Sequence, residues 1–122
     1  MFGLFQRPKL EAKFTASQAV SDEFARQVTL AGSLTLANQG ADADLSGIEM
    51  LIIAGFRRIS LEVPGEWQNF HLAKGASKTG DVGWSKTLDS PLRAQAGELF
   101  VSAQDQKRQT WQWRLPFQFE LR

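Results

Sequence analysis

The sequence predicts an all-β protein folded as a single antiparallel β-sandwich of seven or eight strands. In residues 111–121 every odd position is large and apolar, and every even position is polar or proline. A period of two over this length fits an extended strand with one dry face and one wet face. Shorter segments of the same kind recur at roughly ten-residue spacing, as in β-sandwiches. A chain of 122 residues is long enough for one domain with one core.

The strands are expected in chain order, each from its alternation of apolar and polar residues. Gly32 falls inside a strand, where glycine marks a bulge or a close backbone approach. Residues 48–54 are apolar at both parities, so this strand should be central and covered on both sides. A turn is expected at Asn38-Gln39-Gly40. The expected strands cover residues 9–16, 28–36, 48–54, 59–63, 67–72, a segment starting at 99–101, and 110–121.

Two segments are expected to depart from regular strand structure. Residues 73–86 contain Gly75, Gly80 and Gly83 and form the longest irregular stretch, so they are predicted to be a mobile loop. Pro116 cannot donate to a sheet ladder. The last strand should therefore lie at an edge there, or bulge and change sheets.

Composition excludes several classes of protein. The 14 basic and 13 acidic residues are spread along the chain, and no basic run exceeds two residues, so no nucleic-acid partner is expected. The absence of cysteine excludes disulfides and thiolate metal sites and fits a reducing compartment. No apolar run is long enough to span a bilayer. Residues 1–8 form a short apolar tip without the features of a secretory signal, so a cytoplasmic location is expected.

Phe2 and Phe5 are unusual for a free chain end. Either they tuck onto the core, or they form a small anchor for a partner or a membrane surface.

Motifs for catalysis and cofactor binding are weak. His71 is the only histidine, and no nucleophile is recognisable beside it. Residues 75–80 have the two-glycine spacing of a phosphate loop, but Asp81 stands where the lysine should be. Asp42 and Asp44 begin half of a calcium loop, yet its twelfth position is Ile53 rather than glutamate. The prediction is a solvated turn, with no specific metal site and no cofactor; weak binding of a cation by Asp42 and Asp44 stays open as the alternative.

The four tryptophans divide into core and candidate binding residues. Trp111 and Trp113 share the apolar parity of the last strand and are expected in the core. Trp67 follows a turn and is undecided between core and surface. Trp84 lies in the glycine-rich segment, where it either anchors a ligand or folds back to plug the open end of the sandwich.

Two segments carry a family resemblance. The strand 28–36 with its internal Gly32, followed by Leu45-Ser46-Gly47-Ile48, resembles the early strands of arrestin-fold proteins, in particular the bacterial sporulation-control arrestin-like family. The closing Leu115-Pro116-Phe117 is similar to the Pro-Phe strand of that fold. The matches cover about a third of the chain, and no site residue of the family carries over. The resemblance implies an immunoglobulin- or arrestin-like sandwich used for protein contacts.

The function expected from the sequence is a non-enzymatic protein–protein interaction or regulatory scaffold module. A sandwich that binds carbohydrate or another small ligand through Trp84, and in addition Trp67, is the first alternative. A small enzyme that uses His71 with an Asp or Glu partner is the second. An exposed edge strand would also allow pairing with a second copy of the chain.

Overall fold

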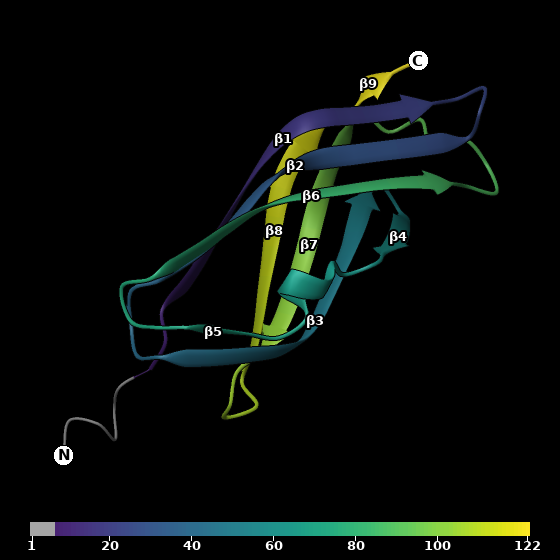
Figure 1. Cartoon of the computed structure of the whole chain (residues 1–122). Helices are drawn as coiled ribbons and strands as arrows, with labels where there is room; N and C mark the ends of the chain where they lie inside the picture. The colour runs from purple at the N-terminus through teal and green to yellow at the C-terminus, as the bar shows by residue number, and fades with distance from the viewer. Residues whose placement is uncertain (1–6) are drawn as a thin grey trace.

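The computed structural model describes residues 7–122, which form two β-sheets packed face to face (Figure 1). The predicted all-β sandwich is therefore confirmed, with nine strands in the described residues rather than seven or eight. The two strands that the sequence did not predict separately are β6, which lies in the segment expected to be a loop, and β9, which has only two residues and follows β8 directly. The strands are β1 (Leu10–Asp22), β2 (Gln27–Asn38), β3 (Ala43–Ala54), β4 (Arg57–Leu61), β5 (Phe70–Leu72), β6 (Ser77–Thr87), β7 (Ala96–Gln104), β8 (Thr110–Gln118) and β9 (Glu120–Leu121).

The strand order places sequence-distant elements side by side. One sheet has the order β6-β2-β1-β9, and the other has the order β4-β3-β7-β8, with β5 paired to the start of β3. Neighbouring strands are antiparallel except for β1 and β9, which pair in parallel at Val20 and Ser21. No helix in residues 7–122 has the length and apolarity needed to cross a membrane.

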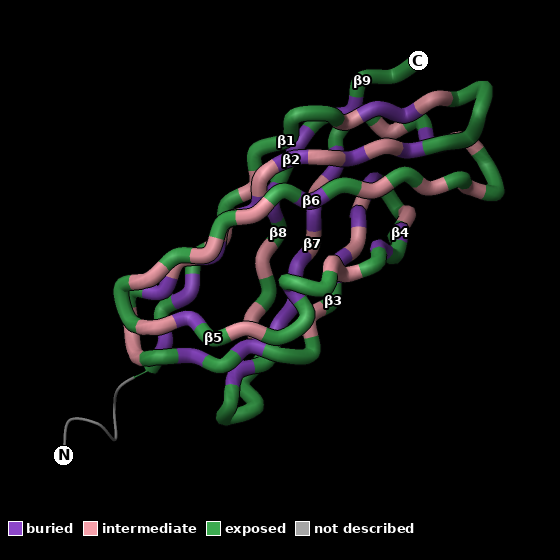
Figure 2. Tube along the Cα trace, in the orientation of Figure 1, coloured by how far each residue is buried: buried purple, intermediate pink, exposed green. Residues whose placement is uncertain are grey.

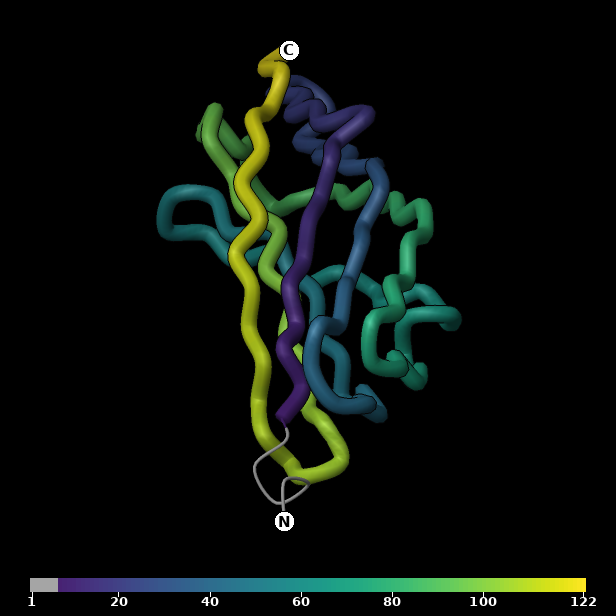
Figure 3. The backbone as a smooth tube through the Cα atoms, turned by 90° about the vertical axis from the view of Figure 1, so that its left-hand side faces the viewer, coloured from purple at the N-terminus to yellow at the C-terminus, as the bar shows by residue number. Residues whose placement is uncertain are grey.

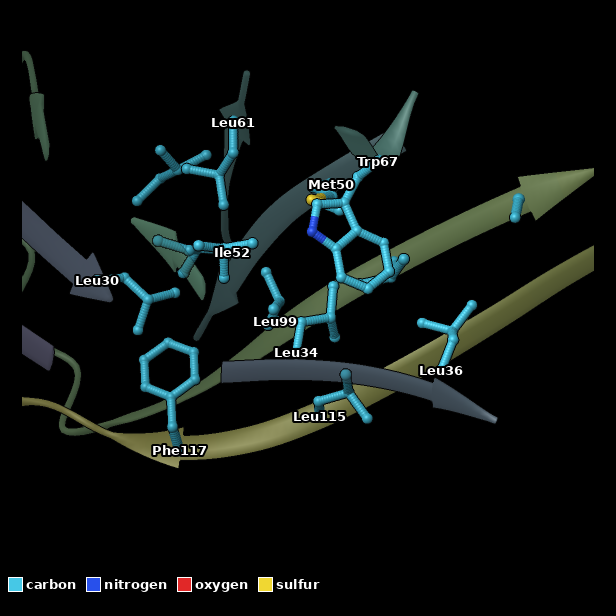
Figure 4. Packing of buried hydrophobic residues seen from close by; sticks show 14 of the residues in the cluster. Leu30, Leu34, Leu36, Met50, Ile52, Leu61, Trp67, Leu99, Leu115 and Phe117 are labelled. Carbon is cyan, nitrogen blue, oxygen red and sulfur yellow. The ribbon is translucent and has the colours of Figure 1, made fainter. Parts of the chain in front are cut away.

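The core lies between the sheets and follows the period-two pattern. In β2 the even-numbered Leu30, Leu34 and Leu36 are almost completely buried, and they face Ile52 of β3 and Leu99 of β7 (Figures 2 and 4). The 3-10 turn Gly65–Trp67 adds the largest buried side chain, that of Trp67. Burial of these side chains is the main driving force for folding.

The end of the chain behaves as Pro116 predicts. Strand β8 is an edge strand, and after Phe119 the chain crosses to the other sheet and pairs with β1. Figure 3 shows the yellow β8 running beside the purple β1. The prediction that the whole odd-numbered face is buried is wrong at its ends: Leu121 is 48% exposed, and Trp111 and Trp113 are only half-buried. They lie where the sheets open, so no facing layer covers them fully.

The prediction of a mobile loop over residues 73–86 is wrong, because residues 77–87 form β6. This strand pairs with β2 over an unbroken register from Ser77 to Thr87. Gly80 packs closely there, since a Cβ at that position would lie 3.2 Å from Nε1 of Trp67, a contact that only a small shift of the indole would relieve. Tertiary pairing thus overrides the low strand propensity of glycine. Val82 and Trp84 both occupy even-numbered positions on one face of the strand, and this alternation is the sequence feature that indicates β6.

Two glycines mark irregularities within strands. Gly32 lies opposite the β1 bulge between Ala16 and Gln18, and a Cβ there would lie 2.3 Å from the Thr15 carbonyl oxygen. The prediction of a bulge or close approach is confirmed. Gly47 has a φ of +58° where the pairing of β3 with β7 shifts register. Its role is that of a bulge residue rather than of the glycine of a calcium loop.

Candidate functional site

Strand β3 is apolar on both faces, and only one face is covered by the core. Met50 and Ile52 point into the sandwich and are buried, whereas Leu51 and Ile53 lie on the outer face and are half-buried. Phe100 of β7 is the direct cross-strand partner of Leu51 and lies on the same outer face. The prediction that this strand is central is confirmed, but the prediction that both of its sides are covered is wrong.

Arginines border these apolar residues on both sides. Arg58 of β4 is the cross-strand partner of Ile53, and Arg114 of β8 is that of Phe100. The outer strip, defined as Leu51, Ile53, Phe100, Arg58 and Arg114, surrounds a hollow of about 190 Å³ together with Gln112.

A second hollow of about 550 Å³ continues the outer strip along the sheet. It shares Ile53 with the first hollow and extends over Gly97 to Pro116. The charge of Arg114 is only loosely balanced, because its Nη1 lies 3.7 Å from Oε1 of Glu98. The two hollows together give the outer face of the five-stranded sheet an uneven surface in which apolar and polar groups alternate, with Arg58 and Arg114 beside the first hollow.

The outer face of the other sheet is chemically different. There the exposed positions of β2 and β6 carry small hydroxyl side chains that pair across the strands. Thr29 and Ser85 lie 3.1 Å apart, and Thr35 and Thr79 lie 2.9 Å apart, between hydroxyl oxygens. The hydroxyl groups of this face form hydrogen bonds with one another and with water. The apolar outer strip is therefore found on only one of the two outer faces of the sandwich.

Trp84 and Trp67 do not form an exposed platform. Trp84 lies on β6 rather than on a loop, points inward and donates Nε1–H to the Glu62 carbonyl at 2.7 Å. This position matches the alternative in which Trp84 closes the sandwich. Trp67 is 1% exposed and packs edge-on against Phe70, with Nζ of Lys78 4.9 Å from its ring centre. Phe2 and Phe5 lie outside the described residues.

The terminal tryptophans line the opposite side of the sandwich. Trp111 and Trp113 are stacked at 6.4 Å between ring centroids, and Trp113 donates Nε1–H to the Leu10 carbonyl at 3.4 Å. Beside Trp113 lies a mostly apolar hollow of about 500 Å³. Its other lining residues are Leu10, Glu11, Ala12, Lys13, Thr35 and Ala37. The apolar parity of Trp111 and Trp113 predicts core positions for both rings and gives no sign of this hollow.

His71 lies beside two carboxylates on the surface. Its Nδ1 is 2.6 Å from Oδ1 of Asp44, and its Nε2 is 3.9 Å from Oδ2 of Asp42. The hydrogen bond to Asp44 is the largest influence and raises the pKa of His71 above 6.5; burial opposes it, and the charges of Asp44 and Asp42 add to the increase. The carboxylates stabilise the imidazolium, but the His71 side chain is 54% exposed and has no dry cavity around it.

The His71 cluster does not amount to a metal site. Within residues 7–122 no three histidine or acidic side chains are arranged to hold a metal ion. Asp42 is also engaged otherwise, because its Oδ1 accepts a hydrogen bond from the Lys74 backbone N–H at 2.8 Å. The cluster joins the start of β3 to β5.

Comparison with known proteins shows the fold. No protein-family model matches the chain, and no curated protein matches it. It is similar to the crystal structure of a Bordetella pertussis protein designated ApaA, with 19% identity, a TM-score of 0.58 and coverage of 93% of this chain and 94% of that one. It is also similar to the structural genomics target SoR45, with 13% identity, a TM-score of 0.55 and coverage of 92% and 85%. The sandwich is thus shared over nearly the full length of both proteins.

A third likeness is more distant. The chain is 14% identical to a β-glucosidase from Listeria innocua, with a TM-score of 0.42, and it spans only 16% of that enzyme. At this distance the likeness has no bearing on the function of the chain.

Proposed function

We propose that this protein is a non-enzymatic interaction module that binds a protein partner through the outer strip. The observation that supports this proposal most directly is the position of Leu51, Ile53 and Phe100 on the outer face of the five-stranded sheet. An outer face of an antiparallel sheet normally meets water and carries polar residues. Apolar side chains that share such a face gain free energy when a partner covers them.

The bordering arginines suit a protein interface. Arginine and aromatic side chains are enriched in interface cores and hot spots, where their planar groups stack and form paired hydrogen bonds. Arg58 has no ion-pair partner within residues 7–122, and Arg114 has only the long contact to Glu98. Both guanidinium groups are therefore available to carboxylates of a partner, which would fix the orientation of the complex.

The experiment is site-specific photo-crosslinking followed by a binding measurement. A photoreactive amino acid at Leu51 should crosslink one protein in native cells, and the same group at Ser33, on the outer face of β2, should not. The partner is then purified, and its affinity for the Ile53→Asp variant is expected to fall at least about tenfold. The matched Ser33→Asp variant should bind normally. Equal crosslinking at both positions, or unchanged affinity of Ile53→Asp, would contradict the proposal.

A second candidate function is the binding of a small planar ligand or sugar beside Trp113. The supporting observation is the hollow of about 500 Å³, in which the indole forms a wall next to Glu11, Lys13 and Thr35. Apolar hollows with a few polar groups are typical of ligand sites. Titration with glycans while tryptophan fluorescence is recorded should give a saturable signal that Trp113→Leu removes. A flat response in the parent protein would exclude this function for the glycans tested.

Two further expectations belong with the main proposal. The chain contains no cysteine, which suits the reducing cytoplasm. The outer edge of β8 is unpaired within the described residues, so a second copy could pair there, although Pro116 and Arg114 disfavour it. Sedimentation of the purified protein over a concentration series measures this self-association.

A further inference from the structure

The exposed large apolar side chains of residues 7–122 lie in the half of the sandwich that contains the C-terminus, on segments that project to different sides in Figure 3. They are Phe24, Phe56 and Leu121, with relative exposures of 101%, 108% and 48%. Phe24 lies in the turn between β1 and β2, Phe56 in the turn between β3 and β4, and Leu121 in β9. All three segments are in the upper half of the molecule in Figure 1. Exposed apolar groups concentrated in this way mark a contact surface.

The two turns are attached to one loop, residues 88–95, which joins β6 to β7. Nη1 of Arg26 donates to the Asp89 carbonyl at 3.2 Å, and Nη1 of Arg57 donates to the Ser90 carbonyl at 2.9 Å. The backbone N–H of Glu23 donates to the Arg122 carbonyl at 2.9 Å, which fixes β9 beside the first turn. The segments that carry the three apolar side chains are therefore linked to one another through loop 88–95 and β9.

Each exposed ring has a cation next to it in the chain. Arg26 follows Phe24 by two residues, and Arg57 directly follows Phe56. Both arginines donate to neutral carbonyl oxygens, and neither forms an ion pair within residues 7–122. Their positive charges are therefore not neutralised locally.

The acidic residues at this end are mostly engaged. Oε1 of Glu23 lies 2.8 Å from Nη2 of Arg93, and Oε2 of Glu120 lies 3.0 Å from Nη2 of Arg122. Oδ1 of Asp22 accepts the Ala25 backbone N–H at 3.0 Å. Asp89 is the remaining carboxylate of the loop. The surface here therefore presents the exposed rings of Phe24 and Phe56, with the positive charges of Arg26 and Arg57 beside them.

We propose that this end of the sandwich docks on the surface of an anionic lipid bilayer. Phe24 and Phe56 insert their rings among the acyl chains near the headgroups, and Arg26 and Arg57 face lipid phosphates. Phenylalanine rings bury at the boundary between headgroups and acyl chains, and the apolar stem of arginine lets its charged group remain among the headgroups. Reversible anchoring needs an apolar and a basic contribution together, and this end supplies both.

A bilayer fits these tips better than a protein partner does. Anchor residues of protein interfaces sit in packed surroundings, whereas the two rings project separately from different turns. A fluid interface accepts each ring independently, without two matched pockets at a fixed spacing. The docking does not rest on the function proposed for the outer strip, and the two can be tested apart.

The first test is sedimentation with vesicles of phosphatidylcholine alone and of phosphatidylcholine with phosphatidylserine. The protein is expected to bind the mixed vesicles and to bind the neutral ones more weakly, with the difference reduced by salt. The double variant Phe24→Ser/Phe56→Ser should lower the partition coefficient about tenfold or more. Both side chains are fully exposed, so the thermal midpoint should not fall. Absence of binding to either vesicle overturns the proposal.

A matched charge control separates docking at this end from general attraction. Arg26→Gln/Arg57→Gln keeps hydrogen-bond donors for the loop carbonyls but removes two charges. Lys74→Gln/Lys107→Gln removes two charges from exposed positions in the turns at the opposite end. Only the arginine variant should lose affinity for the mixed vesicles, and equal losses would overturn the proposal.

The orientation is tested with a polarity-sensitive dye, since the chain has no cysteine of its own. The dye attached at Phe56→Cys should shift to the blue on vesicle addition, and the dye at Lys74→Cys should not. If instead Phe24→Ser/Phe56→Ser abolishes binding of the protein crosslinked at Leu51 and no vesicle binds, this end is a protein contact and the proposal is wrong.

Discussion

Trp84 and Trp113 close the two opposite open sides of the sandwich in the same manner. Trp84 reaches from the edge strand β6 to the carbonyl of Glu62, just after β4, and Trp113 reaches from the edge strand β8 to the carbonyl of Leu10 in β1. Each indole therefore links one sheet to the other by a hydrogen bond and covers apolar core at the opening. The two bonds differ in length, 2.7 Å for Trp84 and 3.4 Å for Trp113.

The difference in length predicts a difference in stability. Trp84→Phe should lower the free energy of unfolding by about 1 kcal/mol or somewhat more, because it removes a short hydrogen bond and part of the indole. For Trp113→Phe the hydrogen-bond contribution should be close to zero, because a 3.4 Å bond is weak. Urea unfolding of the two variants measures both values. A larger decrease in the free energy of unfolding for Trp113→Phe than for Trp84→Phe would show that the lengths of the two hydrogen bonds do not determine their contributions to stability.

Asn38 is the polar residue on which the turn between β2 and β3 depends. Its side chain is completely buried, donates to the Ala41 and Leu72 carbonyls at 2.7 and 2.9 Å, and accepts from the Lys9 and Gly40 backbone N–H groups at 3.2 and 2.9 Å. Asn38→Ala leaves these partners without it, and we expect a loss of about 3 kcal/mol or more.

The exposed neighbour Gln39 provides the control for Asn38. Gln39→Ala should change the free energy of unfolding by less than about 0.5 kcal/mol. Denaturant unfolding of the two variants side by side measures the contrast. Similar values for both would mean that water replaces the Asn38 side chain.

The strand pattern of the sequence predicts the fold class and the positions of most strands along the chain. The alternation in residues 28–36 is the burial pattern of β2, and Pro116 correctly signalled an edge and a change of sheet. The pattern failed for β6, because Gly80 and Gly83 lower local strand propensity and the compensating pairing with β2 comes from a distant segment.

The candidate surface was less visible in the sequence. Residues 48–54 are apolar at odd and even positions, which correctly predicts a central strand. This pattern does not distinguish a face that the chain itself covers from a face that a partner could cover. Arg58 and Arg114 come to that face only through cross-strand register. The proposed membrane-docking surface likewise depends on tertiary contacts, because Arg26 and Arg57 both donate to loop 88–95.

Asp105 organises the hairpin between β7 and β8. Oδ1 accepts the backbone N–H groups of Lys107 and Gln109 at 2.8 and 3.0 Å, and Oδ2 accepts Nε1–H of Trp111 at 3.1 Å. Burial is the largest single influence and acts to raise the pKa of Asp105. Those three hydrogen bonds and the charge of Lys107 together outweigh it, so the pKa lies below 3.8.

The sign of the Asp105 shift sets the pH window. A carboxyl group with a lowered pKa in the folded state stabilises the fold above its unfolded pKa of 3.8, and this stability is lost as the pH falls through the folded value. Asp105→Asn should lower the free energy of unfolding at neutral pH by about 1–3 kcal/mol and reduce the acid dependence. Asp89→Asn, at an exposed loop position, should do neither. An equal effect of both variants would contradict the assignment.

His71 gives the opposite pH dependence. Its pKa is raised above 6.5, chiefly by the hydrogen bond to Asp44, so the folded protein binds the proton more tightly than the unfolded chain does. The resulting stability is fully present below pH 6.5 and is lost as the pH rises through the higher folded value. Because His71 is the only histidine, its ring resonances can be followed through a pH titration without ambiguity.

The matched variant for His71 is Asp44→Asn, which keeps a hydrogen-bond acceptor but removes the charge. The pKa of His71 should move toward 6.5 in this variant, and the decrease of the thermal midpoint between slightly acidic and slightly alkaline pH should become smaller. Asp81→Asn, on β6, serves as a control of equal charge change and should leave the titration unaltered. A His71 pKa at or below 6.5 in the parent protein would mean that the contact between Nδ1 and Asp44 does not persist in solution. In that case the side-chain link between β5 and the start of β3 would be absent, and only their backbone pairing would connect these two segments directly.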